Sequence, residues 1–148
     1  IRIKVELCQQ EEQIFESIIH EINLLEETSV ENLETTLLVI PDYFEDFEHY
    51  NDFLGSANEF LYLRGWEGVY QIASFHPDYQ FAGTDKKDAE NFTNRSPYPI
   101  FHFIREESLS AAIEAYPGVD NIPSKNIALM NSLSEAELKK YFAWCFKR

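Results

Sequence analysis

The residues best suited to chemistry gather in one stretch of the chain, residues 71–106, which holds two of the four histidines. In an extended segment the side chains alternate between two faces, so His76, Asp78 and Gln80 point the same way. Imidazole changes charge near neutral pH, and a neighbouring carboxylate can orient it. We therefore interpret His76, Asp78 and His102 as candidate catalytic residues. The alternative is that both histidines are hydrogen-bonded structural residues that clamp a loop.

The same stretch contains polar side chains that suit an anionic ligand. The arginine fork offers several donors to a carboxylate or phosphate, and amide and hydroxyl groups add uncharged donors. The expected substrate-binding residues are Gln80, Asn91, Asn94, Arg95 and Ser96. The alternative is a rigid turn, which explains the asparagines and the Ser96-Pro97-Tyr98-Pro99 run but gives no reason for Arg95.

A metal or cofactor is not indicated by any specific motif. His76, Asp78 and His102 would form a ligand set for zinc or iron, but such a trio often arises by chance, so no metal is assigned. Gly-rich phosphate loops, the HExxH helix and the Gly-x-Ser-x-Gly elbow are absent, and the chain has only five glycines. The cofactor therefore stays unknown.

Four blocks carry a resemblance to a known family. They are the run Glu34-Thr-Thr-Leu-Leu-Val-Ile-Pro, the run Tyr50-Asn-Asp-Phe-Leu, and the segments Ala73–Gly83 and Asn94–Pro99. Over about Ile1 to Asn131 the chain resembles a bacterial domain-of-unknown-function family, DUF1415. The resemblance implies no established activity. It also implies an upstream helix with a Cys-Pro-Phe-Ala run, which this sequence does not contain, so any chemistry of that cysteine would be missing here.

Composition limits the class of protein. The 148 residues are 45% hydrophobic and 15% aromatic, which predicts one globular domain, residues 1–148, with a substantial core. Cys8 and Cys145 have no CxxC spacing, so a zinc ribbon or disulfide framework is not expected, and a reducing cytoplasmic location fits best. No apolar run approaches the length of a membrane span.

The net charge of −14 is uneven along the chain. Residues 1–75 carry 16 acidic and 3 basic side chains, a net charge of −13, whereas residues 76–148 carry 10 and 9, a net charge of −1. Nucleic-acid binding depends on cations that neutralise phosphates, so we expect no nucleic-acid partner. The acidic half is either the solvated surface of a soluble protein or a docking surface for a partner.

Hydrophobic periodicity predicts four strands and several helices. The first strand is expected to turn Ile1, Ile3, Val5 and Leu7 inward. The expected elements, in chain order, are a strand to Leu7, a helix over Glu11–Glu27, strand Thr35–Ile40, helix Phe44–Leu63, strand Val69–Phe75, strand Ile100–Ile104, helix Leu109–Tyr116, and helices over Ser124–Arg148 broken near Ser132. This order, β-α-β-α-β-loop-β-α-α, indicates an α/β fold, with α+β as the alternative, built on one mixed four-stranded sheet with helices packed on it.

The loop between the third and fourth strands spans about 24 residues, and a loop of that length in a compact domain is usually functional or disordered. His76 lies just beyond the carboxyl end of the third strand, where ligands bind in open α/β sheets. These features favour a small-molecule enzyme that binds an anionic substrate. The competing hypothesis is a non-catalytic binding or assembly module. Its C-terminal aromatic helix, around Tyr141, Phe142 and Cys145, would dock on the core or form a homo-oligomer contact.

Overall fold

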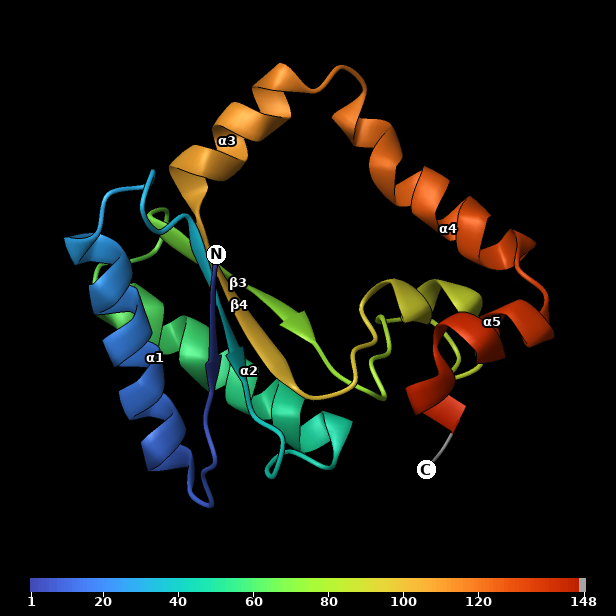
Figure 1. The fold of residues 1–148 in the computed structure, drawn as a ribbon, viewed down its shortest axis with the longest axis horizontal. Helices are drawn as coiled ribbons and strands as arrows, with labels where there is room; N and C mark the ends of the chain where they lie inside the picture. Colours follow the sequence, from blue (N-terminus) through green and yellow to red (C-terminus); the bar gives the residue numbers. More distant parts are fainter. Residues whose placement is uncertain (147–148) are drawn as a thin grey trace.

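Two helices cover one face of a mixed four-stranded sheet in the computed structural model, which describes residues 1–146 (Figure 1). The strands are β1 (Arg2–Val5), β2 (Thr35–Val39), β3 (Tyr70–Phe75) and β4 (Ile100–Arg105), in the spatial order β1-β2-β4-β3. β1 runs parallel to β2, and β4 is antiparallel to both of its neighbours. The predicted α/β class and the mixed four-stranded sheet are confirmed.

The covering helices are α1 (Glu11–Glu27) and α2 (Phe47–Leu63), and each buries one apolar stripe. The buried stripe of α1 includes Ile14, Ile18, Ile22 and Leu25, and that of α2 includes Tyr50, Phe53, Ala57 and Leu61. These side chains meet Leu38, Phe101 and Phe103 of the sheet. Burial raises the pKa of Tyr50, whose hydroxyl donates to the carbonyl oxygen of Ile100 at 2.8 Å.

The helix α2 begins later than its pattern predicts. The sequence indicated a start at Phe44, but the backbone of Phe44 has a φ of +57°, which no α-helix allows. Asp46 instead caps the helix, because its side chain accepts a hydrogen bond from the His49 N–H at 2.9 Å. Phe44 is buried in an aromatic cluster, so the segment before α2 is part of the core.

The predicted orientation of the first strand was wrong. Ile1, Ile3, Val5 and Leu7 are 84%, 65%, 53% and 69% exposed. At the sheet edge α1 presents carboxylate and hydroxyl groups, so the alternate, polar side chains of β1 turn toward the helix and the apolar ones turn away. Arg2, for example, contacts Glu21, which is fully buried.

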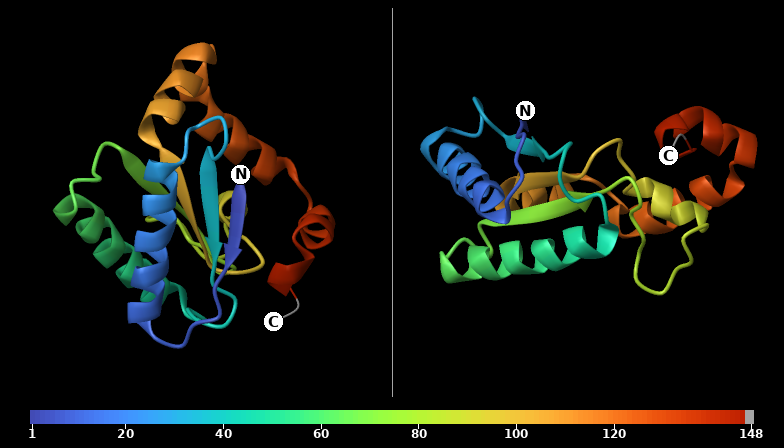
Figure 2. Two further views of the ribbon diagram at one scale, coloured as in Figure 1. Left: turned by 60° about the vertical axis from the view of Figure 1, so that its left-hand side comes forward. Right: turned by 90° about the horizontal axis from the view of Figure 1, so that it is seen from below.

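The C-terminal third extends away from the sheet. Helix α3 (Glu106–Ala115) follows β4 directly and leads to α4 (Ile122–Ser132) and α5 (Glu135–Tyr141). In Figures 1 and 2, α3 and α4 form an arch that returns to the short helix η1 (Ala89–Thr93). The predicted break near Ser132 is confirmed: Ser134 begins α5 with a capping box that it shares with Glu137. The predicted tail reaches Arg148, but residues 147–148 lie outside the described part.

Candidate functional site

His76 is fully buried between α2 and the loop of residues 76–99. Its Nε2 lies 2.8 Å from the carbonyl oxygen of Phe44, and its Nδ1 accepts from the backbone N–H of Asp78 at 3.0 Å. Because a carbonyl oxygen only accepts, Nε2 must carry the proton and Nδ1 the lone pair. The imidazole therefore joins the loop to the segment before α2 through two backbone groups, as the clamp hypothesis describes.

His102 lies on the opposite face of the sheet, where its ring is half-buried near Phe75. Its Nε2 is 2.6 Å from the Thr35 hydroxyl, and that hydroxyl donates its one proton to the Phe103 carbonyl at 2.5 Å. Nε2 of His102 is therefore the donor in the contact with Thr35. Burial lowers the pKa of His102, which favours the neutral ring.

The structure does not bring His76 and His102 together. Phe75 ends β3 with its side chain on the face of the sheet that α1 and α2 do not cover, so strand alternation turns the next residue, His76, toward α2. His102 is paired with Ala73 in the sheet and points the other way. Within residues 1–146 no group of three or more His, Cys, Asp or Glu side chains is arranged to hold a metal ion.

Asn91 holds the long loop in shape from the inside. Its side chain is fully buried, and its Oδ1 accepts from the Phe81 N–H and the Thr84 hydroxyl, each at 2.9 Å. Its Nδ2 donates to the carbonyl oxygen of Asp85 at 2.8 Å. Gln80 adds a hydrogen bond to the Thr84 carbonyl. These amides replace the ladder hydrogen bonds that a loop lacks.

Asn94 and Ser96 fasten the same loop to its surroundings. The Nδ2 of Asn94 donates to the Ser74 carbonyl at 3.1 Å, and the Ser96 hydroxyl donates to the Tyr98 carbonyl at 2.5 Å. Both side chains thus bond to backbone near the two strands that the loop connects. Asp78 and Gln80 line a separate hollow of about 220 Å³ at the start of α2.

Arg95 differs from these residues because it borders a larger cavity of about 520 Å³ between the loop and α5. Its guanidinium lies 4.3 Å from the ring centre of Phe92, and it donates to the carbonyl oxygens of Tyr79 and Lys86 at 3.3 and 2.7 Å. Burial lowers the pKa of Arg95, but guanidinium stays protonated in proteins. The backbone contacts fix the position of the charge at the cavity wall.

Two lysines that the sequence interpretation missed, Lys86 and Lys87, line the same cavity. Phe92 and Phe146 form its apolar part, with ring centres 5.9 Å apart and an interplanar angle of 17°. Among the described residues of the lining, Glu135 is the one acidic side chain, and a hydrogen bond from Lys139 lowers its pKa. The sequence feature that could have indicated this cavity is the adjacent pair of lysines in the long loop of an otherwise acidic chain. The C-terminal helix that completes the cavity could not be placed from the sequence.

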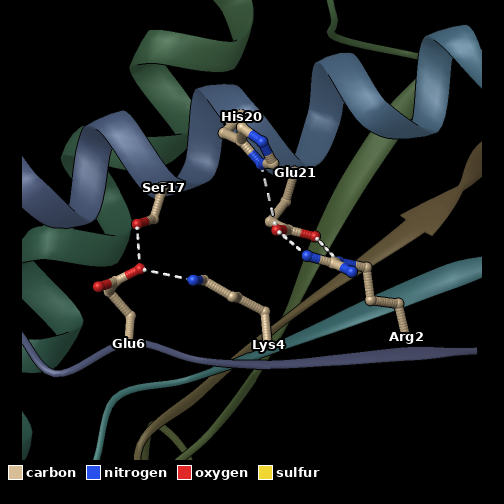
Figure 3. Close-up of polar contacts among 6 residues, drawn as sticks. All are labelled: Arg2, Lys4, Glu6, Ser17, His20 and Glu21. Atoms are coloured by element: carbon tan, nitrogen blue, oxygen red, sulfur yellow. Dashed lines mark hydrogen bonds and ion pairs between the residues drawn. The ribbon is translucent and has the colours of Figure 1, made fainter.

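A second polar cluster joins the edge strand β1 to α1 (Figure 3). The Nε and Nη2 of Arg2 donate to the two carboxylate oxygens of Glu21 at 2.8 and 3.3 Å, and this hydrogen bonding raises the pKa of Arg2. Beside them, Glu6 accepts from the Ser17 hydroxyl at 3.0 Å and pairs with Lys4 at 3.3 Å. Each of these charges has a partner of opposite sign, so we assign the cluster to the attachment of β1.

The C-terminal aromatic run packs on the long loop. The rings of Phe142 and Phe92 lie 5.0 Å apart, and the Cys145 thiol is 3.8 Å from the Pro77 carbonyl. The cavity lined by Lys86, Lys87 and Arg95, which we call the basic cavity, thus lies between the loop and the terminal helices. Along the chain, β4, α3 and α4 separate these two segments.

Comparison with known proteins identifies the family but no activity. The family model described as "Protein of unknown function (DUF1415)" matches residues 1–140, so the chain belongs to that family. No curated protein and no solved structure matches it. Within the described residues, none of the helices combines the length and apolar character needed to cross a membrane.

Proposed function

We propose that this chain is a binding protein for a small anionic molecule, held in the cavity between the loop of residues 76–99 and α5. The observation that carries the proposal is the convergence of Lys86, Lys87 and Arg95 on one cavity in a chain whose net charge is −14. In the rest of the chain acidic side chains outnumber basic ones, so a local excess of cations marks a position that favours an anion.

The geometry of the cavity supports this proposal. Its volume of about 520 Å³ lies within the range of small-molecule sites. Arg95 is held by two backbone carbonyls and by the Phe92 ring, so its charge is positioned before a ligand arrives. The exposed lysines are free to adjust to a carboxylate or phosphate group.

The aromatic side chains of the cavity further limit which ligands would fit. Phe92 and Phe146 offer apolar ring surface beside the cationic groups. A carboxylate or phosphate attached to a flat, apolar body would use both surfaces. Among the described residues that line the cavity there is no histidine, cysteine or serine, which favours binding over catalysis at this position.

Isothermal titration calorimetry with benzoate and with inorganic phosphate as probes tests the proposal. Lys87→Gln is expected to weaken binding about five- to tenfold, because one unit charge near an anion contributes on the order of 1 kcal/mol at a protein surface. The matched control is Lys125→Gln on α4, which makes the same charge change away from the cavity.

The two probes separate the parts of the site. Benzoate carries the apolar ring and phosphate does not, so tighter binding of benzoate supports a role for Phe92 and Phe146. Absence of binding of both probes at millimolar concentration would overturn the proposal. Equal weakening by Lys87→Gln and Lys125→Gln would show that only the overall charge matters, and it would equally overturn it.

A further inference from the structure

The face of the sheet opposite α1 and α2 is apolar and only partly covered within the described residues. Ile3 and Val5 of β1 are 65% and 53% exposed, and the strand residues beside them are half-buried. The side chains on this face are Ile3, Val5, Thr35, Leu37, Val39, Gln71, Ala73, Phe75, Ile100, His102 and Ile104. None of them is acidic or permanently charged. We call this surface the open face.

The helices nearest to the open face also leave apolar side chains exposed. Residues 106–132, which we call the arm, form α3 and α4, and neither helix contains a fully buried residue. Ile127 and Leu129 of α4 are 39% and 56% exposed. Helices of 10 and 11 residues are marginal in water by themselves and normally depend on a packed apolar side.

The arm stands off the sheet of its own chain. Between α4 and the end of β3 lies a cavity of about 490 Å³, whose apolar lining includes Phe75, Phe81, Ile122 and Ile127. α4 rests on η1 and not on the strands, as Figures 1 and 2 show. The open face and the inner side of α4 are therefore two apolar surfaces with space between them.

The accessible surface of the chain is larger than that of a compact monomer. It measures 9230 Å², whereas a folded monomer of 17.3 kDa has about 7,800 Å². The excess is roughly 1,400 Å². A stable interface of standard size buries about 800 Å² on each partner, and obligate dimers bury more. The excess is enough for an obligate interface between two copies.

We infer that this chain forms a symmetric dimer in which the open face and α4 of one copy meet the same surfaces of a second copy. This inference goes beyond the anion site and does not depend on it. Two chains of charge −14 repel one another unless they meet through a surface without carboxylates. The open face has none, and α4 contains Lys125 but no acidic residue, whereas the acidic residues of the arm lie in α3 and the turn after it, outside the proposed contact.

The test is the mass of the protein in solution, measured by light scattering and sedimentation equilibrium over a wide concentration range. The 148-residue chain is expected at twice its mass of 17.3 kDa. Ile3→Lys on β1 and Leu129→Lys on α4 are each expected to weaken the dimer at least tenfold. The matched control is Leu63→Lys, a change of the same kind at a residue of α2 that is 72% exposed and lies off the open face.

The direction of the charge change sharpens this test. Each lysine makes an acidic chain less negative and so reduces repulsion between copies, which means that lost association must come from the lost apolar contact. A dimer also has a melting temperature that rises with protein concentration, a readout that needs no variant.

Three outcomes would overturn the inference. The first is a wild-type mass of one chain at every concentration, with a melting temperature that does not vary. The second is a dimer that both Ile3→Lys and Leu129→Lys leave as tight as the wild type, which would place the contact elsewhere, for example at the C-terminal aromatic helix. The third is equal weakening by Leu63→Lys.

Discussion

Replacing His76 with alanine is expected to lower the free energy of unfolding by about 3–5 kcal/mol. The change leaves the Phe44 carbonyl and the Asp78 N–H without their ring partner, and each unsatisfied buried group costs about 1–3 kcal/mol. It also removes a fully buried ring that lies 5.4 and 5.2 Å from the rings of Phe47 and Tyr50.

Urea denaturation followed by circular dichroism measures this loss, and two further variants test its cause. His76→Gln can place an amide donor near the position of Nε2, so it should recover part of the stability through the bond to Phe44. His20→Ala, at a side chain that is 68% exposed, should cost less than about 1 kcal/mol. If His76→Ala costs less than about 1 kcal/mol and abolishes ligand binding, the clamp assignment is refuted and His76 belongs to a site.

Two other predictions concern Arg105 and His102. Arg105→Ala should lower the free energy of unfolding by about 2–4 kcal/mol, because the two protons of Nη2 are shared among the carbonyl oxygens of Leu25, Thr28 and Leu33 in the last turn of α1 and the segment after it. A thermal melt showing a loss under about 1 kcal/mol would contradict this. Burial holds the pKa of His102 below the ordinary 6.5. As the pH falls below about 6.5, the unfolded chain therefore binds the proton before the folded chain does, and the free energy of unfolding declines. His102→Gln should lessen this decline, and an unchanged dependence of stability on pH would show that His102 does not cause it.

The main features of the fold follow from hydrophobic periodicity. Ile14, Ile18, Ile22 and Leu25 recur at helical spacing, and all four are buried on α1 as expected. The same argument failed for β1, because alternation defines two faces but does not say which one a helix will cover. The decisive partner of Arg2 is Glu21, a buried carboxylate on the next helix, and its orientation depends on how α1 docks.

The candidate site was harder to predict because its contacts are distant in sequence. Strand alternation gives the face of His76, but its partner Phe44 lies 32 residues away in a segment that the pattern assigned to a helix. The interpretation of Arg95 as an anion-binding residue stays a prediction, now with a cavity beside it. The position of Lys87 at the cavity was missed because the pair Lys86 and Lys87 in a loop has no periodic signature, and the cavity forms only where α5 approaches the loop.

The loop of residues 76–99 explains why so many polar side chains are concentrated in one stretch. A loop without ladder hydrogen bonds must satisfy its backbone by other means, and Asn91, Asn94 and Ser96 do so through bonds to carbonyl or N–H groups. A dense polar set is therefore a poor indicator of a catalytic centre when it coincides with a long ordered loop. The better indicator is a residue that such bonding does not explain, which here is each of the two lysines beside Arg95 at the cavity, Lys86 and Lys87.

The C-terminal helices take part in both the proposed dimer contact and the proposed anion site. α4 borders the open face and α5 closes the basic cavity, and only Leu133 and Ser134 separate them. A second copy that fixes α4 would also fix α5, so it would order the cavity wall before an anion binds. If both proposals hold, an anion must then strengthen the dimer by the same factor by which dimer formation strengthens anion binding, because coupling between two binding equilibria is reciprocal.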